Sequence, residues 1–340
     1  MMAEPLPLQE LLHAEFEGEW RDDLATITRA RSNQQISALV DRLVWEELGQ
    51  KIHGAIFAEK SVGAVFGLEL SSGDRVVLKL FHPTQSLVQL AAVHRCLNIL
   101  VHSGFPAPPP QSRLFQTEDG ITGAFYQFMD GTIRDAHEPV VRQELAQVLA
   151  ELARILSDEN FIGLPLAPTR GSELYPPSHR SFLQLHEASE ARWIDDIARR
   201  AQSVVQAKSL PLIPAHLDWG VKNCRFHQDK VSVVYDWDSL FAASEAEMVG
   251  RAAVQFTAQW NFPAPLMPSL AELFAFVHEY QTARGRSFTD EERVVLAASA
   301  NYMLAQEARL ELACGDSSAD GSLALLQSCE RGVFLEMGDD

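Results

Sequence analysis

Apolar and polar residues follow one another with helical spacing near the start of the chain, and this pattern predicts helices over residues 8 to 50. Leu11, Leu12 and Phe16 recur between charged positions, and the apolar residues from Ile36 to Leu48 do the same. Spacings of three and four residues place apolar side chains on one face of a helix. We expect residues 1–50 to form a helical extension ahead of a strand-rich segment.

The strand-rich segment covers residues 51–130. Its apolar runs predict, in order, strands at 56–57, 64–70 and 76–80, a helix at 87–101, and strands at 114–116 and 121–128. The sequence Ser71-Ser72-Gly73-Asp74 is typical of a hairpin turn, and Gly104 with the prolines of residues 106–110 ends the helix. The segment therefore predicts a small antiparallel sheet with one helix inserted.

The remaining residues, 131–340, are predicted to be mainly helical. Helical spacing covers residues 140–156, 181–208, 245–260, 269–284 and 290–314. The strand-like segments that we identify in this half are the short ones at 224–226 and 231–235. Together with a length of 340 residues, which allows two cores, this predicts an α+β, bilobal chain whose lobes connect near Gln127 to Gly131.

Composition narrows the possible partners and location. The net charge of −18 argues against nucleic acid, because phosphate backbones require basic surface. No apolar run approaches the roughly 20 residues of a membrane span, and residues 1–10 lack the pattern of a secretory signal, so we expect no membrane and a cytoplasmic protein. The four cysteines are far apart and form no C-x-x-C pair, which argues against a zinc site and gives no reason to expect disulfides. The pattern carries no signal for an oligomeric state.

One segment of the second half carries a recognisable chemistry. His216-Leu217-Asp218-Trp219-Gly220-Val221-Lys222-Asn223 is followed by the apolar strand at 231–235 and then by Asp236-Trp237-Asp238. An Asp, an Asn five residues later and an Asp after the next strand are the groups needed to orient a hydroxyl nucleophile and to hold Mg²⁺ on a nucleoside triphosphate.

This segment resembles the aminoglycoside phosphotransferase family, which comprises small-molecule and antibiotic kinases of the protein-kinase-like fold. The resemblance implies a small antiparallel-sheet lobe, a larger, mostly helical lobe, and ATP or GTP as co-substrate with Mg²⁺. It implies that Asp218 is the catalytic base and that Asn223 and Asp236 are metal ligands. His216 would support the loop structurally, and Trp237 would pack in the core.

The resemblance also implies nucleotide contacts from the sheet lobe. Lys79, in Val-Val-Leu-Lys, would reach the phosphates, and Ser61 lies in a short polar turn that would contact them; at the connection, Gln127 and Met129 would contact the nucleotide. A departure from the family pattern is that no acidic residue occurs between Leu80 and Thr117 to pair with the lysine. The alternatives for its partner are Gln89, His94, Glu59, or Asp236 together with the phosphates.

The acceptor is the least defined part of the prediction. Its candidate contacts combine carboxylates with aromatic rings, which would suit an aminated sugar or another cationic natural product; they are Trp219, Asp238, Glu245, Glu247, Trp260, Tyr302, Glu307 and Glu311. A metabolic kinase of a sugar or amino alcohol is an alternative, as is a non-catalytic nucleotide-binding protein. A protein kinase is disfavoured, because the chain lacks an Ala-Pro-Glu segment and is expected to pass directly into a helix after Asp-Trp-Asp-Ser-Leu.

Overall fold

The computed structural model describes residues 6–15, 20–60, 62–175, 191–260, 262–315 and 321–329. The chain divides into two compact units, which we name by their content. The sheet unit comprises Met1–Val101 and Pro108–Met129, and the helical unit comprises His102–Ala107 and Asp130–Asp340. Residues 102–107 join the helical unit through the backbone N–H of Val234, which donates to the carbonyl of Pro106 at 2.7 Å.

A five-stranded antiparallel sheet forms the centre of the sheet unit, in the strand order β1-β2-β3-β5-β4. Its strands are β1 (Ile52–Lys60), β2 (Ala64–Leu70), β3 (Arg75–Phe81), β4 (Phe115–Gln116) and β5 (Thr122–Gln127). The turn between β2 and β3 lies where Ser71-Ser72-Gly73-Asp74 predicts it, and Gly73 has the positive φ of 86° that such turns require. The predicted first strand was too short, because β1 continues to Lys60 in register with Ala64.

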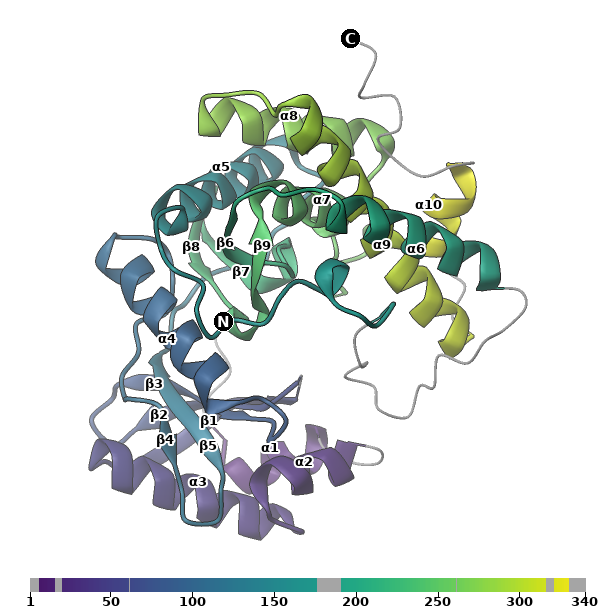
Figure 1. Ribbon diagram of the computed structural model, residues 1–340. Helices are drawn as coiled ribbons and strands as arrows, with labels where there is room; N and C mark the ends of the chain where they lie inside the picture. Colours follow the sequence, from purple (N-terminus) through teal and green to yellow (C-terminus); the bar gives the residue numbers. More distant parts are fainter. Residues whose placement is uncertain are drawn as a thin grey trace. The chain divides into compact units, whose positions relative to one another are not determined.

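One face of this sheet packs against the N-terminal helices. These are α1 (Leu8–Glu15), α2 (Trp20–Thr28) and α3 (Asn33–Leu48), which fall within the residues 8 to 50 where helices are predicted. Alternate strand residues such as Phe66 and Leu78, which lie opposite each other, share a core with Val40 and Leu43 of α3. Figure 1 shows α3 along one side of the sheet and α4 (Leu87–His102) along the other.

The alternation of strand side chains places Lys79 on the other face, the one that α4 covers. Lys79 lies opposite Val65 on β2 and Ala124 on β5. Its neighbours Leu78 and Leu80 face the core that the sheet shares with the N-terminal helices. Tyr126 shares the face of Ala124, and its hydroxyl is 2.7 Å from Nε2 of His94 on α4. Lys79 and the inserted helix α4 are therefore on the same side of the sheet.

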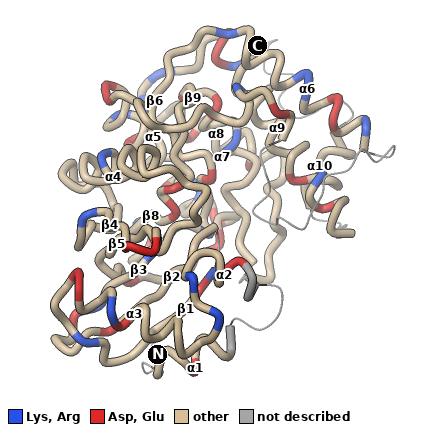
Figure 2. The backbone as a smooth tube through the Cα atoms, turned by 60° about the horizontal axis from the view of Figure 1, so that its bottom comes forward, with Lys and Arg blue, Asp and Glu red and all other residues tan. Residues whose placement is uncertain are grey.

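Helices dominate the helical unit, as the sequence predicts. They are α5 (Pro139–Leu156), α6 (Arg192–Gln206), α7 (Glu245–Gln255), α8 (Leu270–Arg284), α9 (Asp290–Cys314) and α10 (Ser322–Ser328). In its described residues α6 begins at Arg192; the part of the predicted helix from Ser181 to 190 lies outside the described residues. Figure 2 shows acidic and basic positions following one another along α6, where Arg199 pairs with Asp196 at 2.8 Å.

Three of these helices begin with a reciprocal cap that fixes their first residue. Ser244, Ser269 and Thr289 each accept a hydrogen bond from the backbone three residues later, and the Glu at that position bonds back to the cap. This arrangement satisfies two N–H groups that the first turn of a helix leaves without partners. It sets the start of α7 at Glu245, of α8 at Leu270 and of α9 at Asp290.

Two strands of the helical unit were missed in the sequence. In addition to β7 (Cys224–His227) and β8 (Lys230–Val234), the structure contains β6 (Leu212–His216) and β9 (Leu240–Ser244), which pair with each other. The expectation that Asp-Trp-Asp-Ser-Leu leads directly into a helix was therefore wrong, because β9 intervenes. The pairing of Leu212 with Ser244 joins residues 32 positions apart, and local patterns do not reveal it.

Among the described residues, no helix combines the length and apolar character needed to span a bilayer.

Candidate active site

The predicted catalytic loop begins at the end of β6 and is fixed by its backbone. The carbonyl of Leu217 accepts hydrogen bonds from Nε of Arg251 at 3.2 Å and from Nε2 of Gln255 at 2.9 Å, both on α7. The Leu217 N–H donates to the carbonyl of Ser239 at 3.0 Å. Asp218 therefore follows a residue that is held on both sides. Arg251 and Gln255 were not anticipated, although their spacing of four residues places them on one face of a helix.

Gly220 allows the loop to approach the end of α7 closely. A Cβ atom at this position would lie 2.9 Å from the carbonyl oxygen of Gln255. The next residue, Val221, donates its N–H to the carbonyl of Phe256 at 2.9 Å. Close packing thus explains why a glycine occupies this position of the motif. The bond from Val221 holds the short 3₁₀ turn Val221–Asn223 against the end of α7.

Asp218 and Asn223 are in direct contact. Nδ2 of Asn223 donates to the backbone carbonyl of Asp218 at 2.7 Å and to its carboxylate Oδ2 at 3.1 Å. Because the amide NH₂ group is turned toward Asp218, the amide oxygen of Asn223 points away from that carboxylate. Both side chains are half-buried.

Backbone bonds at Tyr235 bring the second Asp next to this loop. The Tyr235 N–H donates to the carbonyl of Asn223 at 2.8 Å, and its carbonyl accepts from Nε2 of His216 at 3.1 Å. Asp236 follows in a left-handed conformation, with φ of 62°, which is uncommon for a residue other than glycine. Its Oδ2 accepts from the hydroxyl of Ser239 at 3.0 Å. Asp218, Asn223 and Asp236 therefore belong to one backbone-bonded assembly.

His216 is completely buried in this assembly. Its ring makes edge contacts with Trp219 and Trp237, at centroid distances of 5.8 and 5.5 Å. Burial lowers the pKa of the imidazole, and the opposing charges of Asp218 and Asp236 do not restore it. Since its partner is a carbonyl oxygen, Nε2 must carry the proton of the neutral ring.

Trp219 and Trp237 are core residues in this arrangement. Their exposed fractions are 1% and 5%, and Nε1 of Trp237 donates to the carbonyl of Val234 at 2.7 Å. The ring of Trp237 also contacts Phe105 edge-on, at 5.8 Å. Core packing of Trp237 agrees with the expectation; Trp219, considered a wall of the acceptor site, is equally enclosed. Asp238 is half-buried beside them.

Lys222 is a further site residue that the sequence interpretation overlooked. Its Nζ lies 2.8 Å from Oδ1 of Asp218 and 5.3 Å from the ring centroid of Trp260. Burial lowers the pKa of the ammonium group, but the charge of Asp218 and then that of Glu307 outweigh this effect and raise it. A lysine four residues after an acid usually indicates a surface ion pair, which concealed its place in the site.

Glu307 and Tyr302 come from α9. Burial raises the pKa of Glu307, with Lys222 acting in the opposite direction, so this carboxyl group has Lys222 as its main attractive charge. Tyr302 is fully buried and donates its hydroxyl to the carbonyl of Leu174 at 2.6 Å. Burial also raises the pKa of Tyr302 to about 12.

Two candidate acceptor carboxylates have structural partners instead. Glu247 is fully buried, completes the cap of α7 with Ser244, and accepts from Arg170 at 2.7 Å. Glu311 accepts from the backbone N–H groups of Ser322 and Leu323 at the start of α10, at 2.7 and 2.9 Å. The protein's own groups therefore engage both carboxylates; the Ser-x-x-Glu spacing before an apolar run was the signal for the partner of Glu247.

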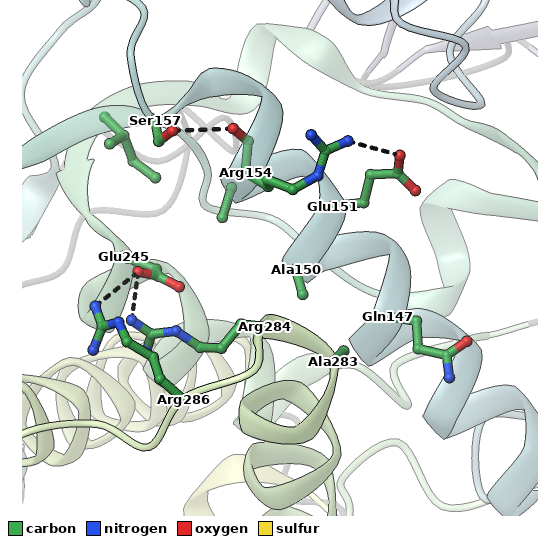
Figure 3. Close-up of a pocket in the computed structure, with 11 residues that line it drawn as sticks. Gln147, Ala150, Glu151, Arg154, Ser157, Glu245, Ala283, Arg284 and Arg286 are labelled. Carbon is green, nitrogen blue, oxygen red and sulfur yellow. Dashed lines mark hydrogen bonds and ion pairs between the residues drawn. The ribbon is translucent and has the colours of Figure 1, made fainter.

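Glu245 lines a cavity of the helical unit that is drawn in Figure 3. The cavity has a volume of about 590 Å³ and is lined by residues of α5, β6, α7 and the end of α8. Glu245 binds the hydroxyl of Tyr280 at 2.5 Å and Arg284 at 2.9 Å. The lining residues do not include Asp218, Asn223 or Asp236, so the structure does not bring Glu245 together with the predicted catalytic group.

The residues of the sheet unit that were expected to contact the nucleotide lie on β3, at the end of β5 and between β1 and β2. Lys79 is half-buried in the middle of β3, and His94, one of its suggested partners, is bonded to Tyr126. Gln127 ends β5 with its N–H donating to the carbonyl of Pro109 at 2.8 Å, and Met129 ends the unit. Ser61 lies outside the described residues.

The turn near Ser61 approaches β3 closely. A Cβ atom on Gly63 would lie 2.4 Å from the carbonyl oxygen of Leu80, so a larger residue would not fit there. On the other side of the turn, Lys60 forms an ion pair with Asp23 of α2 at 2.5 Å.

Within the described residues, no group of three or more His, Cys, Asp or Glu side chains could hold a metal ion. Asn223 and Asp236 offer one neutral and one charged oxygen donor, which suits a hard cation. Two protein ligands are enough for Mg²⁺ when nucleotide phosphates and waters supply the remaining positions.

Comparison with known proteins identifies the family. The sequence model of the phosphotransferase enzyme family (APH) matches residues 63–246, which is more than half of the chain and contains the whole loop from His216 to Asp236. The chain belongs to this family. The expectation of a phosphotransferase enzyme is thereby confirmed. A search of curated proteins by sequence finds no match.

Solved structures show that the phosphotransferase has the fold of small-molecule kinases. Amicoumacin kinase hAmiN, solved with AMP-PNP and Ca²⁺, has a TM-score of 0.59 at 12% identity, covering 81% of this chain and 86% of its own. An ethanolamine kinase of Plasmodium vivax has a TM-score of 0.58 at 15% identity, with coverage of 96% and 97%. A spectinomycin phosphotransferase in complex with ADP and spectinomycin has a TM-score of 0.52 at 14% identity, with coverage of 89% and 94%. The predicted α+β kinase-like fold is confirmed.

Proposed function

We propose that the phosphotransferase transfers the γ-phosphate of ATP or GTP to a hydroxyl group of a small molecule in a Mg²⁺-dependent reaction. The observation that carries the proposal is the contact of Asn223 with both the carbonyl and the carboxylate of Asp218, in a loop bonded to the residue before Asp236. Family membership supports the reaction class. The assembly supplies one carboxylate for the acceptor and separate oxygen donors for the metal–nucleotide complex.

Asp218 would orient the acceptor hydroxyl and receive its proton. The acceptor oxygen bonds to the γ-phosphorus, the bond from that phosphorus to the bridging oxygen breaks, and the nucleoside diphosphate leaves. A carboxylate offers about four lone-pair positions, so Asp218 can accept a hydroxyl while Lys222 and Asn223 remain bonded to it. Arg251 and Gln255 keep the loop in place through Leu217. Orientation is the main requirement, because the attacking oxygen is little deprotonated in a loose transition state.

Mg²⁺ would be held by the amide oxygen of Asn223 and the carboxylate of Asp236. When bound, the ion neutralises charge on the phosphate oxygens of the nucleotide. Asp236 is suited to this role because its left-handed backbone and its bond from Ser239 fix the carboxylate. The hydrogen bonds from Nδ2 of Asn223 select the orientation in which the amide oxygen is the donor to the metal.

For the nucleotide, we propose contacts from Lys79 to the phosphates and from Gln127 and Met129 at the end of the sheet unit, with Ser61 as a further contact. The position of Lys79 on the α4-covered face supports this role, since its neighbours on β3 are committed to the core. ATP and GTP both fit this proposal. Among the similar structures, one is solved with AMP-PNP and another with GDP and kanamycin.

Two acceptor classes remain as proposals. The first is an aminoglycoside-like or related natural product, supported by family membership and by similar structures that carry spectinomycin or kanamycin. The second is a sugar or amino alcohol of metabolism, supported by the similarity to an ethanolamine kinase. For acceptor contacts we propose Trp260 and Glu307; the exposure of Trp260 (67%), its distance of 5.3 Å from Nζ of Lys222, and the electrostatic effect of Glu307 on Lys222 support this proposal.

The proposal is tested by measuring nucleoside diphosphate formation by the purified protein. ATP and GTP, each with Mg²⁺, are supplied with a panel of aminoglycosides, peptide antibiotics, sugars and amino alcohols. We expect formation of a phosphorylated acceptor that stops when EDTA removes the metal. Absence of nucleotide binding and of transfer to any acceptor would contradict the proposal.

A further inference from the structure

Lys222 places a positive charge directly on the predicted catalytic carboxylate. Its Nζ is 2.8 Å from Oδ1 of Asp218, and 21% of its side chain is exposed. The same ammonium group lies 5.3 Å from the ring centroid of Trp260, at a distance typical of a cation–π contact. Trp260 is itself 67% exposed. One lysine therefore contacts both the proposed base and an aromatic ring that an acceptor could use.

Three carboxylates act electrostatically on this ammonium group, and Asp218 is the one in direct contact with it. The charges that raise the pKa of Lys222 against its burial come from Asp218, Glu307 and Asp236, in that order. Carboxylates next to an exposed aromatic ring would by themselves attract an ammonium group of an acceptor. In this chain the ammonium group of Lys222 lies where the ammonium group of an acceptor would bind, so the protein itself neutralises these carboxylates.

The other carboxylates proposed as contacts of a cationic acceptor do not provide a negative site in place of the one that Lys222 occupies. Glu247 is paired with Arg170, Glu311 caps α10, and Glu245 is bonded to Tyr280 and Arg284 beside another cavity. Arg251, which is buried and bonded to the carbonyl of Leu217 just before Asp218, adds a second positive charge to the site. The surroundings of Asp218 therefore differ from the acid-rich pocket that the sequence interpretation suggested.

We infer that Lys222 selects the acceptor by its charge. The acceptor is a hydroxyl compound that carries no ammonium group on the carbon next to the reacting hydroxyl. This inference rests on the proposed function. An acceptor hydroxyl bonded to Asp218 brings a neighbouring ammonium group close to Nζ of Lys222, where the two positive charges repel and compete for Oδ1. A neutral diol meets no such opposition. Amino groups on more distant parts of an acceptor are unaffected.

Matched pairs of acceptors test this inference with the full chain, Mg²⁺ and ATP. The pairs are glycerol with 2-amino-1,3-propanediol, and ethylene glycol with ethanolamine; in both amino compounds every hydroxyl is on the carbon next to the one that carries the ammonium group. We expect kcat/KM at neutral pH to favour the uncharged member by at least about tenfold, a lower bound for the effect of one contact between like charges. Lys222→Met should abolish or reverse this preference, and Lys222→Arg should retain it. Lys208→Met is the control, because Lys208 has only a distant pairing with Glu291, at 3.7 Å.

A binding measurement decides the inference independently of turnover. Ethanolamine is titrated into the wild type and into Lys222→Met and followed by ligand-observed NMR; thermal melting shows that the variant is folded. Tighter binding to Lys222→Met, by about tenfold, is the expected result. Equal affinity of the two proteins for ethanolamine, or an unchanged preference within the acceptor pairs, overturns the inference. Loss of metal-dependent nucleotide binding in the wild type would instead refute the proposed function.

Discussion

The imidazole of His216 donates a hydrogen bond from Nε2 to the carbonyl of Tyr235 across 3.1 Å, and this bond connects the two halves of the proposed active-site motif. His216 ends β6, just before Asp218, and Tyr235 immediately precedes Asp236. The histidine is buried and held neutral by its surroundings, so it functions as a fixed donor. The first residue of the motif is thus a support for both acids.

Replacement of His216 by alanine should disrupt this connection. We expect a loss of about 2–4 kcal/mol in the free energy of unfolding, because the change removes a buried ring and leaves the Tyr235 carbonyl without its donor. Turnover should fall with it, since Asp236 is no longer fixed relative to Asp218. Urea unfolding and steady-state kinetics measure the two effects. His227→Ala, at an exposed position, is the control, and an equal loss in both variants would argue against the supporting role.

Much of the fold could be predicted because its signals are local. The turn at Gly73, the strand from Val231, and the helix from Asp290 to Cys314 all follow from residue spacing and from turn or cap residues. β9 escaped prediction because Leu-Phe-Ala-Ala-Ser has no alternating pattern, and its strand form depends on pairing with β6. Long-range pairing is not encoded in a short window of sequence.

The candidate site shows the same division between local and long-range signals. The spacing of Asp218, Asn223 and Asp236 was sufficient to anticipate that they gather in one place. The roles of Arg251 and Gln255 were not visible, because the carbonyl that they hold is more than thirty residues away. Lys222 was overlooked for another reason. The effect of an Asp–Lys pair depends on whether the pair is exposed, and the identities of the two residues do not show how deeply they are buried.

Gly220→Ala should be destabilising for a steric reason. The added Cβ would lie 2.9 Å from the carbonyl oxygen of Gln255, closer than side-chain atoms normally approach. We expect a loss of about 1–3 kcal/mol, together with reduced turnover, because the loop must move away from α7. Differential scanning calorimetry gives the stability change. Gly171→Ala is a matched control, since its Cβ would be 3.4 Å from the nearest oxygen at an ordinary φ of −77°. Similar losses at both positions would contradict the steric explanation.

The ion pair at the start of α9 should make stability depend on pH. Hydrogen bonds from Arg286 lower the pKa of Glu292 to about 2, against the effect of burial, from an ordinary value of 4.5. A carboxyl group with a lowered pKa in the folded state stabilises the fold above pH 4.5, and this stabilisation is lost as the pH falls from 4.5 toward 2. The shift corresponds to about 1–3 kcal/mol once the exposure of Arg286 is considered.

Glu292→Gln should therefore lower the free energy of unfolding at pH 7 by about that amount and show a smaller loss on acidification. Chemical denaturation of the wild type and the variant at pH 7 and pH 3 measures both quantities. Glu291→Gln, at the more exposed neighbouring position, should behave like the wild type. A variant that retains the full pH dependence of the wild type would show that other groups are responsible.

Lys79→Met should weaken nucleotide binding if the lysine contacts phosphate. We expect at least about a tenfold increase in the dissociation constant for the Mg²⁺–ATP complex, since a charge-assisted bond to phosphate contributes about 1.5–3 kcal/mol. Isothermal titration calorimetry measures the constant. Lys51→Met, an exposed position just before β1, is the control for the loss of one positive charge. Unchanged affinity in Lys79→Met would remove this residue from the proposed nucleotide site.

The most direct test of the account compares Asp218→Asn with Asp236→Asn in the same two measurements, turnover and affinity for the Mg²⁺ complex of AMP-PNP. For Asp218→Asn we expect turnover to fall by roughly a hundred- to ten-thousandfold, with affinity changed by less than about threefold. For Asp236→Asn we expect affinity for the metal–nucleotide complex to fall and to recover partly at high Mg²⁺. If affinity collapsed on changing Asp218 and survived the change of Asp236, the proposed division of roles between the two acids would be wrong.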